Sequence, residues 1–170
     1  MKKITNPKLL KSLKVIHLIC AFLWMGSACA MVLLLFVLSP TNFHELYMRS
    51  LVLKMIDDYL IIPGANGCLL TGIIYGLCTN WGFFRHRWLV VKWVLTIFMI
   101  ASGTFAMGPC VNGNVYPTEE ITRYTLDNAE FFGNIVQVKF WGIIQLLCLL
   151  VTVIFSVYRP FKKKHMAIRR

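Results

Sequence analysis

Charged residues are scarce in this chain, and acidic residues are the scarcest. Aspartate and glutamate together contribute 7 of the 170 residues, and all charged residues together only 15%. Soluble domains carry about 25% charged residues. The six cysteines show no CxxC or Cys/His spacing typical of zinc, and no internal repeat is evident. These absences exclude an ordinary soluble domain, a structural zinc site and a repeat architecture.

What fills the chain instead is apolar sequence, which makes up 58% of the residues. A membrane-spanning helix needs about 20 mostly apolar residues, and four segments qualify, at about 15–38, 59–78, 88–108 and 136–158. We predict an all-α fold, a four-transmembrane-helix antiparallel bundle that forms a single integral membrane domain over residues 1–170. We expect an external loop at 109–135 and a basic cytoplasmic tail at 159–170. The first apolar run exceeds the roughly 7–15 residues of a signal-peptide core, so we expect it to remain as a helix.

The charges that are present alternate between the connections. The net charge is +11, and the basic residues precede the first span, separate the second from the third, and follow the fourth. The acidic residues gather in the other two connections. Because basic loops face the cytoplasm, both termini are expected there, in a bacterial cytoplasmic (inner) membrane. The basic excess then contacts anionic lipid headgroups and not nucleic acid.

The first span, "KVIHLICAFLWMGSACAMVLLLFVL", carries a histidine within its first turn. Ionisable side chains in spans are costly, face the protein interior and are often functional. Trp24 follows His17 by seven residues and shares its helical face. Lys92 lies at a similar depth in the third span, so we predict that His17 and Lys92 belong to one site on the cytoplasmic side. The alternatives are a packed histidine bonded to backbone and a lysine that extends to the headgroups.

The second span contains the helix-breaking stretch "IIPGANGCLLTG". Pro63 removes a backbone hydrogen bond, and the glycines allow another helix or a planar group to approach closely. We expect the Asn66 amide to hydrogen-bond across helices. The stretch is either a kinked packing helix or one side of a cofactor slot.

Other polar residues are assigned structural roles. Five cysteines fall within the spans as packing residues, whereas Cys110 is placed in the external loop. Lys139 is expected to pair with Asp57 or Asp58. A short amphipathic helix is predicted to start at 118–124, because "TEEI" has the pattern of a helix N-terminus.

Three segments together resemble a family pattern: "LKVIHLICAFLWMG", "MIDDYLIIPGANGCLLTGIIYG" and "WLVVKW". They are similar to small bacterial integral membrane proteins allied in pattern to copper-resistance protein D, and to the four-helix membrane protoporphyrinogen oxidases. The resemblance covers roughly residues 13–108 and matches His17, Trp24, Pro63 and Lys92 to family positions. In the oxidase family such residues are associated with a b-type haem, so the resemblance implies a haem site here.

The chemistry of the residues suits that cofactor. A neutral imidazole is a good axial ligand for haem iron, which assigns the first ligand to His17. Depth favours His86 as the second ligand over Met25 and Met99, while His44 and His165 lie away from the site. The residues expected to surround the cofactor are Trp24, Asn66, Lys92, Arg85 and Arg87, the last three as cations for the propionates.

Two functions follow from these patterns. The first is a haem-b-binding integral membrane protein and oxidoreductase, which exchanges electrons with a quinone, a porphyrin intermediate or another membrane redox protein. The second is a non-catalytic membrane protein, a small carrier or assembly partner, without a cofactor. A second copy of the chain is a further candidate partner, as a homo-oligomer.

Overall fold

The computed structural model describes residues 6–78, 87–115 and 129–158. In this part of the chain the fold is all-α, and four helical segments are long and apolar enough to cross a membrane. They are Pro7–Val37, His44–Cys78, Arg87–Gly113 and Phe131–Tyr158. The prediction of a four-span membrane protein is therefore confirmed.

The first span is the single helix α1 (Pro7–Val37), which begins eight residues before the predicted start. The Asn6 side chain accepts a hydrogen bond from the Lys8 backbone N–H at 3.0 Å, and Pro7 occupies the first turn, where a missing N–H costs nothing. The helix ends at Leu38, whose backbone is extended. The basic segment ahead of the predicted span is thus part of the helix.

The second span is longer than predicted, because the connection expected at 39–58 is mostly helical. Helix α2 (Phe43–Ile56) continues through a π-helical turn, η1 (Asp57–Ile61), into α3 (Ile62–Cys78). Asn42 caps α2 by accepting from the Glu45 backbone N–H at 2.9 Å, and the Glu45 carboxylate accepts from the Thr41 backbone N–H at 2.8 Å. These reciprocal bonds start the helix well before the apolar run.

The third span also contains a π-helical turn. It consists of α4 (Arg87–Ser102), η2 (Gly103–Met107) and α5 (Gly108–Gly113). In both spans a proline follows two residues after the π-helical turn, Pro63 after η1 and Pro109 after η2. A proline ring clashes with the carbonyl four residues earlier in an α-helix, and the wider turn relieves that clash, so the helix continues.

This continuation corrects the placement of Cys110. It lies in α5 and is buried, with its Sγ 3.3 Å from the Ala106 carbonyl oxygen, and not in an external loop. The fourth span, α6 (Ala129–Tyr158), starts before the predicted residue 136. The connection between the third and fourth spans is therefore shorter than the predicted 109–135. The helix predicted at 118–124 lies outside the described residues.

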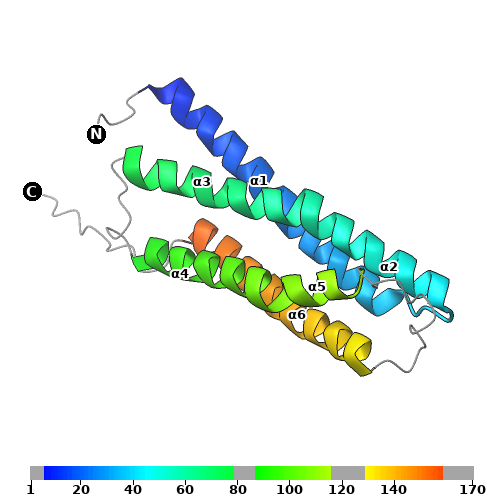
Figure 1. Cartoon of the computed structure of the whole chain (residues 1–170). Helices are drawn as coiled ribbons and strands as arrows, with labels where there is room; N and C mark the ends of the chain where they lie inside the picture. Colours follow the sequence, from blue (N-terminus) through cyan, green and yellow to red (C-terminus); the bar gives the residue numbers. More distant parts are fainter. Residues whose placement is uncertain (1–5, 79–86, 116–128, 159–170) are drawn as a thin grey trace, which may run out of the picture.

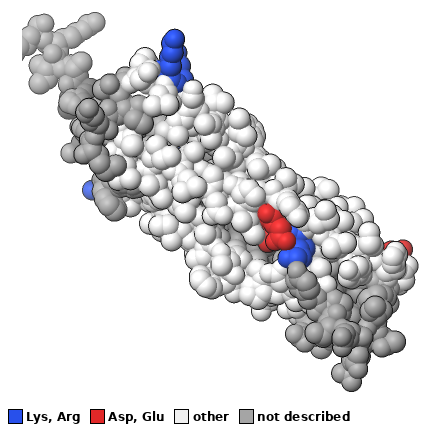
Figure 2. All heavy atoms as spheres, turned by 45° about the horizontal axis from the view of Figure 1, so that its top comes forward, with Lys and Arg blue, Asp and Glu red and all other residues white. Residues whose placement is uncertain are grey.

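The four spans lie side by side (Figure 1). Helix α1 packs most extensively on α3, α4 packs on α6, and α1 and α6 join the two pairs. We call the end that holds the start of α1 and the end of α6 the terminal end, and the opposite end the distal end. In Figure 2 few charged side chains are visible, one adjoining pair of opposite charges lies part of the way along the body, and most of the visible face is uncharged.

The core runs along the bundle axis as two main clusters. The cluster nearer the distal end contains Met31, Leu35, Leu53, Met107, Cys110, Val111 and Val138. The cluster nearer the terminal end contains Trp24, Ala28, Ala65, Cys68, Met99 and Leu149. The second cluster follows His17 along α1, on the side toward the middle of the bundle.

Candidate functional site

His17 lies on α1 and faces α3. Its side chain is half-buried, and its Nδ1 atom is 2.7 Å from the Thr71 hydroxyl oxygen. Along the same face of α1 follow Trp24, Ala28 and Met31, all buried. The sequence thus placed His17 correctly on the inward stripe of its helix.

The Thr71 hydroxyl determines which ring nitrogen of His17 carries the proton. This hydroxyl has one hydrogen, and it is directed to backbone carbonyls of its own helix, 2.6 Å from the Gly67 oxygen and 3.1 Å from the Cys68 oxygen. With its proton on the Gly67 carbonyl, the hydroxyl oxygen accepts from His17, and this pattern assigns the neutral imidazole proton to Nδ1. The Nε2 lone pair is left available. A histidine held in this way through Nδ1 has the arrangement common to metal-ligating histidines.

Three further contacts hold the terminal half of α1 against α3. The Tyr75 ring meets the His17 ring edge to face with centroids 6.3 Å apart, and its hydroxyl donates to the Leu10 carbonyl at 3.1 Å. The Cys68 Sγ lies 3.9 Å from the His17 carbonyl oxygen. The imidazole is therefore fixed by a hydrogen bond and by an aromatic neighbour.

Small residues bring the backbones of α1 and α3 together. A methyl group added at Gly64 would lie 2.8 Å from the Trp24 backbone nitrogen and 3.1 Å from the Cys20 carbonyl oxygen. A methyl group at Gly67 would collide with the Cys20 side chain. The glycines of the second span thus serve close helix packing, one of the two roles predicted for them.

Trp24, whose backbone forms this contact with Gly64, also has a buried side chain. It is only 4% exposed, and its indole N–H has no hydrogen-bond partner among the described residues. A buried donor without an acceptor is rare in folded proteins. The indole therefore presents a free donor within the bundle core.

Lys92 approaches the same region from α4. Its ammonium donates to the Ser156 hydroxyl of α6 at 3.3 Å and interacts electrostatically with the His17 imidazole and the Cys68 thiol. Lys92 thus lies within electrostatic range of His17, and their membership of one site stays a prediction. The next residue, Trp93, lies 3.6 Å from the position of a methyl group added at Gly72, which brings α4 close to α3.

The other predicted site residues are placed less favourably. Asn66 is exposed on the outer side of α3, so the expected interhelical bond of its amide is wrong. Gly64, Cys68 and Thr71 occupy the inward face and turn Asn66 outward. Arg87 is exposed at the start of α4, and Arg85 and His86 lie outside the described residues.

The methionines and His44 also have clear positions. Met99 is 1% exposed in the core, Met25 is half-buried, and His44 is exposed at the distal end. Over the described ranges, no group of three or more His, Cys, Asp or Glu side chains is arranged to hold a metal ion.

One amide that the sequence analysis overlooked does link helices. Gln145 of α6 is 6% exposed, and its Nε2 donates to the Met99 carbonyl and to the Met107 sulfur, each at 3.3 Å. Its position in the middle of the apolar run "FWGIIQLLCLL" was the available signal. Gln145 is the interhelical amide that Asn66 was expected to be.

The predicted ion pair of Lys139 is also wrong. Its ammonium lies over the Phe36 ring, 5.1 Å from the centroid, while Asp58 pairs with Lys54 at 2.9 Å. Lys54 is one helical turn from Asp58, so this pair forms within a single helical segment. Its ammonium also donates to the Asn112 side chain at 2.6 Å.

No protein-family model, curated protein or solved structure matches the chain. The resemblance to the membrane protoporphyrinogen oxidases therefore stays a prediction. The geometry around His17 is the basis for any functional assignment.

Proposed function

We propose that this four-span membrane protein binds haem b through His17. The observation that carries the proposal is the hydrogen bond between His17 and Thr71, which fixes the proton on Nδ1 and leaves Nε2 free to ligate iron. The residues present fit one axial position of a haem. The assignment of the second position to His86 remains part of the proposal.

Each residue near His17 has a defined part in this proposal. Thr71 orients the imidazole, and Tyr75 limits its rotation. Lys92 and Arg87, both at the terminal end, would neutralise the propionates. The buried indole N–H of Trp24 would donate to an acceptor on the bound group. A bound haem supplies one-electron chemistry, which suits exchange with a quinone, a porphyrin intermediate or a membrane redox partner.

A non-catalytic membrane protein without a cofactor is the second candidate. The close backbone contact between α1 and α3 at Gly64 favours it. In such a tightly packed pair of helices, the His17–Thr71 hydrogen bond would only hold α1 against α3. In that case Nε2 of His17 has no ligand to hold.

The absorption spectrum of the purified protein separates the two candidates. The protein is expressed in cells supplied with a haem precursor, together with His17→Ala and the matched control His44→Ala, whose histidine is exposed at the distal end. We expect the intense violet haem band in the wild type and in His44→Ala, and its loss in His17→Ala with normal membrane insertion. A colourless wild type, or an unchanged spectrum in His17→Ala, would reject haem ligation by His17.

We further infer that the terminal end faces the cytoplasm of a bacterial inner membrane. The helix starts and ends there carry Lys8, Lys11, Lys14 and Arg87, and lysine-rich and arginine-rich ends stay on the cytoplasmic side. A matched pair of exposed serines tests it. An impermeant thiol reagent should label Ser39→Cys on intact cells above the wild-type background, and Ser12→Cys only after permeabilisation. The reverse pattern would invert the topology.

A further inference from the structure

A second buried polar group lies at the distal end, far along the bundle from His17. Arg49 of α2 is 8% exposed, and its Nη1 donates to the Leu38 carbonyl at 2.9 Å. Its Nε–H has no hydrogen-bond partner, and no carboxylate among the described residues forms an ion pair with the guanidinium. A buried arginine is normally paired.

The unused donors of Arg49 point in one direction. With Nη1 bonded to Leu38, the side of the guanidinium formed by Nε and Nη2 makes no hydrogen bond to a described residue. These two N–H groups are parallel and match the spacing of two oxygens on one carboxylate or phosphate. The arginine thus presents a bidentate fork to the space beside it.

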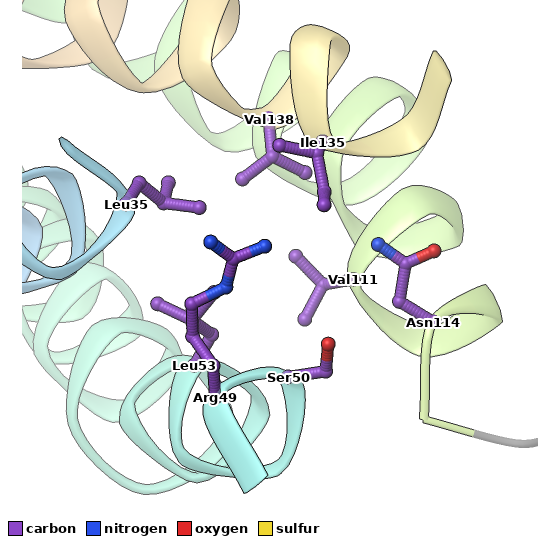
Figure 3. A pocket seen from close by; sticks show the side chains of 8 residues that line it. All are labelled: Leu35, Arg49, Ser50, Leu53, Val111, Asn114, Ile135 and Val138. Carbon is purple, nitrogen blue, oxygen red and sulfur yellow. The ribbon is translucent and has the colours of Figure 1, made fainter. Parts of the chain in front are cut away.

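That space is a small pocket between four helices (Figure 3). The guanidinium extends into it among the apolar side chains of Leu35, Val111 and Val138. Its volume is about 10 Å³, enough for about one water molecule. The pocket is therefore present in this structure, and a group larger than one water molecule, such as a phosphate, would have to widen it.

Asn114 adds a second donor to the pocket. Its side-chain oxygen accepts from the Asn134 amide at 3.0 Å, and in Figure 3 its amide nitrogen is turned toward the pocket. Ser50, also in the lining, donates its proton to the Leu46 carbonyl at 3.0 Å. Within the described ranges no acidic side chain lines the pocket, and the donors found there favour an anion.

The depth of Arg49 indicates which anions can reach it. Counting about 20 residues from Lys14, the last lysine ahead of the apolar run, crosses the hydrocarbon core and reaches Leu34. Leu38, the partner of Arg49, lies about 6 Å further by the same rise. This is the level of the lipid headgroups, where phosphate oxygens are abundant.

We propose that the pocket at Arg49 binds one phosphate group, with the Nε/Nη2 fork on two of its oxygens and Asn114 on a third. The phosphate belongs either to a phospholipid headgroup or to inorganic phosphate. An unpaired buried cation destabilises a fold, and a bound oxyanion removes that penalty. The site is independent of haem binding at the opposite end.

Two measurements on the purified full-length protein distinguish the sources. Native mass spectrometry detects retained phospholipid, and thermal unfolding in delipidated detergent solution is titrated with sodium phosphate against sodium chloride at equal ionic strength. The variants are Arg49→Gln, Arg49→Lys, which keeps the charge but not the fork, and the control Lys139→Gln, which removes a charge outside the pocket.

For a lipid phosphate, we expect a phospholipid retained by the wild type and Lys139→Gln and lost from both Arg49 variants. For free phosphate, we expect phosphate-specific stabilisation with an apparent affinity about tenfold or more weaker in Arg49→Gln, as expected for a charged hydrogen bond. A wild type that neither retains phospholipid nor responds to phosphate overturns the proposal, even if the Arg49 variants fail to fold. Equal binding by wild type and Arg49→Gln also overturns it.

Discussion

The two ends of the bundle bury polar side chains in opposite ways. At the terminal end the donors find partners on neighbouring helices, as His17 does on Thr71 and Lys92 on Ser156. At the distal end Arg49 is more deeply buried, yet its Nε–H and Nη2 groups make no hydrogen bond to a described residue. The terminal end is therefore assembled by helix-to-helix bonds that depend on helix spacing, whereas the distal end offers donors that the proposed phosphate would use. Substitutions that change the spacing between helices should therefore affect the terminal end and leave the distal end unchanged.

The largest effect is expected from Gly64→Ala. The added methyl would press on the Trp24 backbone, which cannot move without shifting α1. We expect a loss of about 2–3 kcal/mol in the free energy of unfolding, typical of overpacking. Denaturation in mixed detergent micelles measures it. Gly26→Ala, with nothing within 4 Å of the new methyl, is the control and should change stability by less than about 1 kcal/mol. Equal effects at both glycines would show that α1 and α3 are not closely packed.

A smaller effect is expected at Gln145, which lies between the two ends, near the middle of α6. Gln145→Leu removes its bonds to the Met99 carbonyl and the Met107 sulfur, and should cost about 1–2 kcal/mol. The same unfolding measurement applies. The control is Gln137→Leu, since Gln137 is exposed on the same helix. If the two variants behave alike, Gln145 does not link α6 to α4.

The smallest effect should come from Thr71→Val, which removes one interhelical bond of the terminal end. The expected loss is about 0.6–1 kcal/mol. Thr152→Val is the control, because the Thr152 hydroxyl bonds only to Cys148 within its own helix. The difference between the two variants isolates the bond to His17. Any haem band should shift in Thr71→Val without disappearing, since Nε2 is untouched; complete loss of the band would mean that Thr71 acts on more than the orientation of His17.

The sequence was sufficient for the four spans and for the inward stripe of the first helix. Apolar length and the seven-residue spacing of His17 and Trp24 depend only on local periodicity. The start of α2 could not be read from hydropathy, because its first turn is held by the polar residues Asn42 and Glu45. Ending the third span at about residue 108 misplaced Cys110, since a π-helical turn lets the helix continue past Pro109.

Local sequence patterns could not predict which side chains contact each other within the site. His17 and Thr71 are 54 positions apart, and their contact depends on how far α1 slides along α3. Asn66 and Gln145 are both amides within apolar spans, yet one faces outward and the other inward. Choosing between them requires the packing of the whole bundle. The unpartnered fork of Arg49 likewise appears only when its neighbours are in place.

The two π-helical turns have a consequence for how the chain tolerates changes in length. A π-helical turn holds one residue more than an α-helical turn, so it resembles a single-residue insertion absorbed without rotating the rest of the helix. Deleting Phe105, which is 81% exposed in the middle of η2, should convert the turn to regular α-helix and leave the angular phase of α4 and α5 unchanged, while it restores the clash of the Pro109 ring with the preceding turn. Deleting Val94, 62% exposed in a regular stretch of α4, should rotate one part of the helix against the other by about 100° and separate the faces that now pack together.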